Sequence, residues 1–254
     1  MNKDFRRRIA AAALTILLGA FLPTGCAHKQ PIPVIGSTTT VPTTSTVVPT
    51  EPAVKTEHIS LSRETDGDVT IEYPQLSGLA DAAMQQTVNQ LLREDALSVR
   101  SRYSSEGATI EAVGRVVDNR APLLSVVYTG HYVASGSPYP ISLLYASTID
   151  VAQGKRVRLS DAVNVDKAAK ALQQGKGRMP EGADSAVFAD AAEYVRTEEQ
   201  ALLLSQLKAA DFAGDGFPDA FSYRQGEETI VISLPVPHAV GDHAEFVFML
   251  ADLV

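Results

Sequence analysis

The chain contains no tryptophan and one cysteine among its 254 residues, and aromatic residues make up 6% of it. With a single cysteine no disulfide can form within the chain, so its stability has to come from a packed core. No Gly-x-Ser-x-Gly motif occurs, and sequence inspection gives no support for nucleophilic catalysis. The net charge is −8, which disfavours nucleic acid as a partner and favours cationic ones.

The cysteine stands where a lipoprotein signal would place it. Arg6, Arg7 and Arg8 precede an apolar run from Ile9 to Leu22, and Thr24-Gly25 leads to Cys26. The run is short for a membrane span, which needs roughly 20 residues, and suits a signal-peptide core. We therefore predict a signal peptide over residues 1–25 and an acylated Cys26 that holds the chain on the cell membrane or outer membrane, facing the extracytoplasmic side. Ordinary secretion with cleavage after Ala27 is the alternative. Removal of residues 1–25 would change the net charge to −11.

A segment rich in threonine and proline follows the cysteine. Residues 31–55 hold five Pro, seven Thr and two Ser, and no aromatic residue. Because proline blocks both helix and sheet hydrogen bonding, and because few side chains here can form a core, we predict a disordered tether over residues 26–56.

The periodicity of apolar residues after the tether predicts an α+β fold, with antiparallel sheets and helices packed to one side. Two alternating runs around Gly67 predict a hairpin, and residues 78–103 predict an amphipathic helix capped by Ser77. We expect two sequential subdomains, over residues 57–163 and 164–254. The other expected elements are strands at 108–117, 123–133, 141–151, 229–234 and 244–249, helices at 163–172 and 186–207, and a turn at 118–122.

Several segments carry a family resemblance. They are IEYPQLSGL, VNQLL, LLSVVYTGHYV and STIDVAQGKRVRLSDAV within residues 71–163, and PHAVGDHAEFVFMLADL near the end of the chain. The first part resembles the domain that precedes the catalytic part of PdaC-type peptidoglycan deacetylases. It is also similar to the extracellular domain of RsiV-type lysozyme-sensing anti-sigma factors, and the last part resembles the partner domain in those proteins. We expect the chain to carry this module without a deacetylase or sigma-binding domain.

This resemblance implies a non-catalytic binding or sensing module at the cell envelope, with no cofactor. The expected ligand is a lysozyme-like cationic protein or peptidoglycan, and a hydrolase or deacetylase acting on cell-wall glycan is the alternative function. Family members often carry a loop histidine where this chain has Ser135, Gly136, Ser137, Pro138 and Tyr139. We expect Tyr139, in a loop bracketed by prolines, to be exposed and to contact the partner.

Two clusters contain residue types that can bind metals, but we expect no metal site at either. His238 and His243 flank Asp242 in a turn that contains Gly241, but a third convincing zinc ligand is absent from this stretch. The acidic loop with Asp211, Asp215, Gly216 and Asp219 does not have the spacing of a calcium loop. A third candidate, His131, is expected to be a hydrogen-bonded strand histidine.

Overall fold

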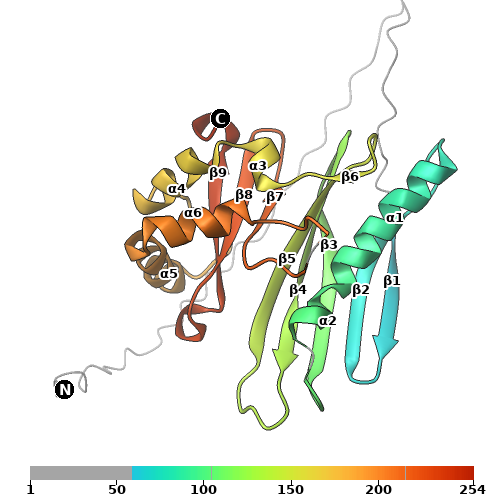
Figure 1. Ribbon diagram of the computed structural model, residues 1–254, viewed down its shortest axis with the longest axis horizontal. Coiled ribbons are helices and arrows are strands. Elements are labelled where there is room, and N and C mark those ends of the chain that lie inside the picture. The colour runs from blue at the N-terminus through green and yellow to red at the C-terminus, as the bar shows by residue number, and fades with distance from the viewer. Residues whose placement is uncertain (1–58, 104, 215) are drawn as a thin grey trace, which may run out of the picture. The chain divides into compact units, whose positions relative to one another are not determined.

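A computed structural model describes residues 59–254 except 104 and 215. The predicted signal peptide, Cys26 and the tether lie outside these residues. Six strands form one sheet in the order β1 to β6, in which every neighbouring pair is antiparallel except β2 and β3 (Figure 1). Their bounds are β1 (Ile59–Asp66), β2 (Val69–Leu76), β3 (Thr109–Arg120), β4 (Leu123–Val133), β5 (Ile141–Asp150) and β6 (Lys155–Arg156).

The parallel pair arises because a helix connects β2 to β3. Two helices fill this connection, α1 (Ala82–Leu97) and the short α2 (Val99–Arg102), where the sequence predicts one continuous helix. The N-cap is Asp81, whose carboxylate accepts hydrogen bonds from the N–H groups of Ala83 and Met84 at 2.9 and 3.0 Å. The prediction that Ser77 caps the helix is therefore wrong. The helix begins four residues later, at a residue type that is equally favoured as a cap.

The face of α1 that packs on the sheet covers two stacked tyrosines. Tyr128 of β4 and Tyr145 of β5 are fully buried, and their ring centroids lie 4.7 Å apart. Their hydroxyl groups donate to the carbonyl oxygens of Leu92 and Ala96 at 3.2 and 2.9 Å. Each ring thus buries its apolar area while its polar atom stays hydrogen-bonded, as a buried tyrosine requires.

A buried carboxylate also joins α1 to the sheet. Asp95 is 1% exposed, and it accepts hydrogen bonds from Arg156 Nε at 2.8 Å and from Ser147 Oγ at 2.7 Å. Arg156 also pairs with Glu94 at 3.1 Å. Because an unpaired buried charge is costly, these contacts fix the position of α1 over β5 and β6.

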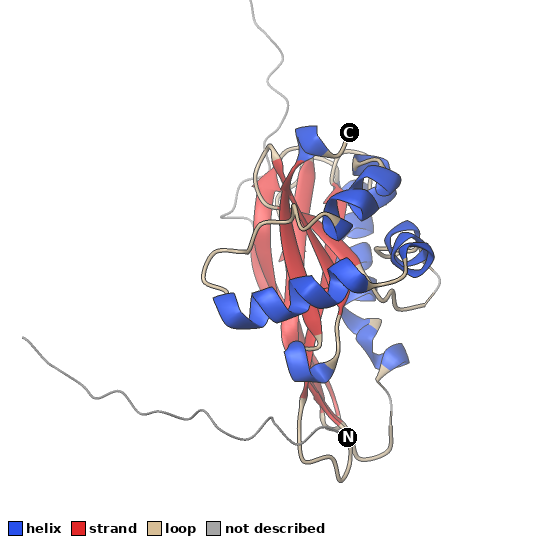
Figure 2. Cartoon of the chain, turned by 90° about the vertical axis from the view of Figure 1, so that its left-hand side faces the viewer, coloured by secondary structure: helices blue, strands red, loops and turns tan. Residues whose placement is uncertain are grey.

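The second half of the chain forms a three-stranded antiparallel sheet with helices beside it. The sheet has the order β7 (Phe221–Arg224), β8 (Thr229–Pro235), β9 (His243–Met249). The helices are α3 (Leu159–Ala162), α4 (Val165–Gln173), α5 (Ser185–Thr197) and α6 (Gln200–Lys208), with 3-10 turns η2 (His238–Val240) and η3 (Leu250–Asp252). Figure 1 shows α4, α5 and α6 beside this smaller sheet, whose other side faces β5. Figure 2 shows the strands side by side, with most of the helices to one side of them.

Three details differ from the sequence predictions. The helix expected over residues 186–207 is divided into α5 and α6, and the short strand β7 was not predicted. Residues 118–120, expected in a turn, continue β3 because a register shift between Val116 and Asp118 carries the pairing on to Arg120. The α+β class and the presence of two subdomains are confirmed.

The two subdomains share part of their apolar interior. One core cluster lies under α1 and the other among α3 to α6, β8 and β9. The first cluster also contains side chains from the second half, including Phe212, Phe221 and Tyr223. The ring centroids of Phe217 and Phe221 lie 5.4 and 6.3 Å from that of Tyr145, so the aromatic contacts cross from β5 to β7 and the segment before it.

Candidate functional site

The loop between β4 and β5 holds the residues that the sequence singles out as a partner contact, Ser135 to Tyr139. It begins with a turn in which the N–H of Ser137 donates to the carbonyl oxygen of Ala134 at 2.9 Å, with Gly136 at φ +76°. The hydroxyl of Ser137 then donates to the carbonyl oxygen of Tyr139 at 3.0 Å. Tyr139 itself is 68% exposed, which is the largest exposed fraction among the large hydrophobic side chains of the described residues.

A second segment, distant in sequence, holds this loop in place. Asp242, at φ +69°, accepts a hydrogen bond from the N–H of Ser142 at 2.7 Å, directly after the loop. Its other carboxylate oxygen lies 2.8 Å from His238 Nδ1. The His238 ring in turn lies 6.4 Å from the ring of Tyr139, centroid to centroid. The turn between β8 and β9 thus contacts the Tyr139 loop at Tyr139 itself and the strand that follows the loop at Ser142.

Next to this contact lies a small cleft, which we call the β5 cleft. Since β6 pairs only with Ile149 and Asp150, no strand of the described residues 59–254 pairs with the outer edge of the first half of β5. The cleft has a volume of about 120 Å³. It is lined by Arg102, Tyr103, the β5 residues Ile141 to Leu144, Phe217 to Asp219, Ser233, Pro235, Asp242 and His243.

Charge around the β5 cleft is mixed. Asp219 pairs with Arg102 at 2.7 Å, and Asp242 faces His238. Burial raises the pKa of the Tyr103 hydroxyl, Arg102 opposes this effect, and the charges of Asp242 and Asp219 add to it. Tyr103 therefore stays neutral near physiological pH and can donate a hydrogen bond to a ligand.

The histidines and aspartates considered as metal ligands have other partners. Among the described residues 59–254, without 104 and 215, no three His, Cys, Asp or Glu side chains are grouped so that they could hold a metal ion. His238 contacts Asp242, and burial lowers the pKa of His243. His131, on β4, lies 3.6 Å from Glu111 across the strand pair.

The aspartates of the acidic loop likewise have separate partners. Asp211 is buried and accepts hydrogen bonds from Leu159 and Ser222, whereas Asp219 is exposed and pairs with Arg102. Asp215 lies outside the described residues. Asp211 and Asp219 thus serve different elements.

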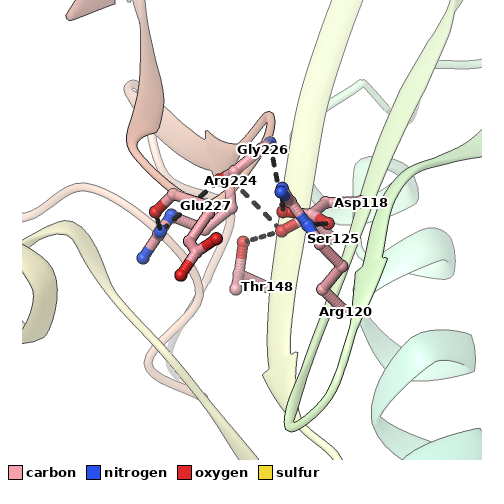
Figure 3. Close-up of polar contacts among 7 residues, drawn as sticks. All are labelled: Asp118, Arg120, Ser125, Thr148, Arg224, Gly226 and Glu227. Carbon is pink, nitrogen blue, oxygen red and sulfur yellow. Dashed lines mark hydrogen bonds and ion pairs between the residues drawn. The ribbon is translucent and has the colours of Figure 1, made fainter. Parts of the chain in front are cut away.

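A polar cluster between the two sheets had no sequence signal (Figure 3). Asp118, on β3, accepts two hydrogen bonds from Arg120 at 2.9 and 2.8 Å and one from the N–H of Gly226 at 3.2 Å. The Arg120 guanidinium helps to hold the pKa of Asp118 below its ordinary value, although burial opposes this effect. Beside it the N–H of Arg224 donates to Ser125 Oγ at 3.2 Å. Since Gly226 and Arg224 each donate a backbone hydrogen bond to the larger sheet, we interpret this cluster as a structural link between the two sheets.

Comparison with known proteins gives likeness in fold alone. No family model matches the chain, and no curated protein does. One similar solved structure is a DUF3298 family protein from Pseudomonas aeruginosa, 9% identical, which covers 80% of this chain and 93% of its own with a TM-score of 0.46. Another is a DUF3298 member from Bacteroides fragilis, 14% identical, with coverages of 76% and 89% and a TM-score of 0.41.

Proposed function

We propose that this chain is a lipoprotein of the cell envelope, anchored through Cys26, and that its folded part is a binding module without catalytic activity. The partner we propose is a lysozyme-like cationic protein or, failing that, peptidoglycan. The lone cysteine after a basic and apolar leader supports the anchor. None of the helices in residues 59–254 that the structure describes is long and apolar enough to span a bilayer.

The observation that carries the binding proposal is an exposed aromatic side chain on an ordered loop. Tyr139 is 68% exposed, yet the residues on either side of it are hydrogen-bonded within the loop or to Asp242. Tyrosine provides a large contact area at a low cost in conformational entropy, because its side chain has few rotatable bonds. A fixed loop lowers the entropy cost of association further. Such a side chain is typical of the central residues of protein interfaces.

The charge of the chain agrees with a cationic partner. The net charge of −11 after loss of residues 1–25 would attract a basic protein and raise the rate of encounter. Attraction between exposed charges is screened beyond about 8 Å at physiological ionic strength, so this contribution falls as salt increases.

The test is binding to lysozyme and to purified peptidoglycan, measured on an immobilised chain at low and high salt. We expect binding that weakens with salt, and a loss of about tenfold or more in affinity for Tyr139→Ala. The matched control is Tyr194→Ala, which removes a 40% exposed tyrosine from α5. Equal losses in the two variants, or no binding to either ligand at low salt, would refute the proposal.

The anchor has its own test. Cys26→Ala should move the chain from the membrane fraction to the soluble fraction and abolish metabolic labelling with a palmitate analogue. A variant that stays in the membrane fraction, together with a wild-type chain that takes up no label, would contradict acylation.

A further inference from the structure

A hollow that lies away from the Tyr139 loop is lined by three lysines. It has a volume of about 470 Å³, within the range of about 300–1,000 Å³ that small-molecule sites occupy. Its lining includes Lys167, Lys170, Lys176, Gln174, Phe248 and Asp252. We call this hollow the lysine cavity. A positive cavity is notable in a chain whose overall charge is −8.

The lysines come from one helix and the turn that ends it. Lys167 and Lys170 are three residues apart on α4, so they lie on the same side of the helix. At its end Gly175, at φ +65°, donates its N–H to the carbonyl oxygen of Leu172 at 2.9 Å. The N–H of Lys176 donates to the carbonyl oxygen of Ala171 at 3.0 Å. This pair of bonds is a Schellman motif, which fixes the backbone of Lys176 at the end of α4.

The opposite wall is fixed by β9. Arg178 and Val247 exchange two backbone hydrogen bonds of 2.9 Å, which attach the segment after the turn to the strand. Gly177 lies so close to the aromatic side chains beneath that a Cβ atom there would be 2.9 Å from Phe246 and 3.1 Å from Phe248. The backbone next to Lys176 is therefore held against the cavity wall that contains Phe248.

The charges of the cavity are mostly uncompensated. Lys167 Nζ donates to the carbonyl oxygen of Val254. Within the described residues, no ion pair and no side-chain hydrogen bond engages the ammonium groups of Lys170 and Lys176. Asp252 is the one carboxylate among the described lining residues. The cavity thus offers two free ammonium groups to a ligand, with a third beside them.

We propose that the lysine cavity binds a phosphorylated sugar or sugar-like ring, a site beyond the proposed partner surface at Tyr139. Lysines are typical phosphate ligands, and several ammonium groups suit a doubly charged phosphate. The volume exceeds what a phosphate alone would fill. The amide of Gln174 can donate to and accept from ring hydroxyls, and the small exposed part of Phe248 adds apolar lining.

The test is calorimetric titration of the full chain with glucose phosphate, inorganic phosphate and glucose. We expect glucose phosphate to bind, and the other two to bind at least tenfold more weakly. Lys170→Gln and Lys176→Gln should each weaken binding about tenfold, because each removes a charge-assisted hydrogen bond. Lys208→Gln removes the same charge from α6, outside the cavity, and should leave binding unchanged.

Two further measurements distinguish a soluble phosphorylated sugar from a phosphorylated ring in a lipid head group. Phosphatidylcholine vesicles, with and without phosphatidylinositol phosphate, report whether the chain prefers a phosphorylated ring on a lipid. A preference that the lysine variants abolish assigns the site to the lipid head group, and binding of glucose phosphate alone assigns it to soluble ligands. Equal loss in Lys208→Gln, equal affinity for inorganic phosphate, or no binding in any arm would overturn the proposal.

Discussion

The buried carboxylate of Asp211 should make the stability of the fold depend on pH. Asp211 lies between α6 and β7 and is 5% exposed. One of its oxygens accepts from the N–H of Leu159 at 2.7 Å and from the hydroxyl of Ser222 at 2.6 Å, and the other accepts from the N–H of Ser222 at 2.5 Å. Burial nevertheless raises the pKa of this carboxyl group to about 6, from an ordinary value of 3.8.

The sign and size of the effect follow from this difference in pKa. Because the folded-state pKa is above the unfolded value, the folded chain retains the proton between about pH 4 and pH 6, where the unfolded chain has lost it. The free energy of unfolding therefore falls as the pH rises through this window, and the contribution is fully present only below it. A difference of about two pKa units corresponds to about 3 kcal/mol, since each unit contributes about 1.4 kcal/mol.

Urea unfolding at several pH values between about 4 and 7 measures this contribution. Tyrosine fluorescence and circular dichroism report the transition, as the chain contains no tryptophan. Asp211→Asn keeps the shape of the side chain and cannot titrate, so the stability difference between wild type and variant isolates this group. We expect that difference to shift by about 3 kcal/mol in favour of the variant as the pH rises. A constant difference would show that the three hydrogen bonds offset the effect of burial, and a shift in favour of wild type would show that they outweigh it; either would refute the prediction.

The remaining predictions concern the six-stranded sheet and α1, each checked by the urea midpoint of unfolding. Gly130→Ala should cost more than about 4 kcal/mol or prevent folding, because a Cβ atom there would be 1.8 Å from the carbonyl oxygen of Glu111. Gly67→Ala should cost only about 1 kcal/mol, as its φ is +58° but no atom lies within 4 Å; an equal cost at both glycines would refute the steric argument. Asp95→Ala should cost about 3 kcal/mol, since Arg156 loses its buried partner, and Asp95→Leu with Arg156→Met should recover most of it. No recovery in the double variant would show that packing, not charge, sets the cost.

The elements that the sequence predicted are those with a clear hydrophobic period. The strands β4, β5 and β9 and the first hairpin alternate or form apolar runs between turn residues, and all are present. Strand β7 has only four residues, Phe221–Arg224, which alternate between apolar and polar side chains. An alternation this short is at the lower limit of what predicts a strand.

The division of the helix over residues 186–207 could not be read from spacing. Its buried residues are Ala191 and Val195 in α5, and Leu203 and Leu207 in α6. Their separations of four, eight and four residues are those of one uninterrupted helix, and neither glycine nor proline marks the break at Glu198.

The candidate sites depend on contacts between residues that are distant in sequence, which a sequence pattern cannot predict. Proline on both sides of Tyr139 predicted a loop, and the residue is exposed. Its role as a partner contact stays a prediction. The contact between Asp242 and Ser142 joins residues 100 positions apart, and no local pattern reports such a pair. The lysine cavity also depends on Phe248 of β9, which is distant in sequence from α4. From the sequence of α4 alone, its lysines indicate only an ordinary helix with a solvent-exposed face.

The aromatic contacts of β5 with β7 and the segment before it determine whether part of the chain could fold alone. A fragment that ended near residue 163 would expose Tyr145 to water where Phe217 and Phe221 now cover it. Each half thus completes the interior of the other, and the folded region should lose its structure in one cooperative transition, without a stable half-folded species. The two subdomains should then fold only together, and neither should fold if it is transferred alone to another protein.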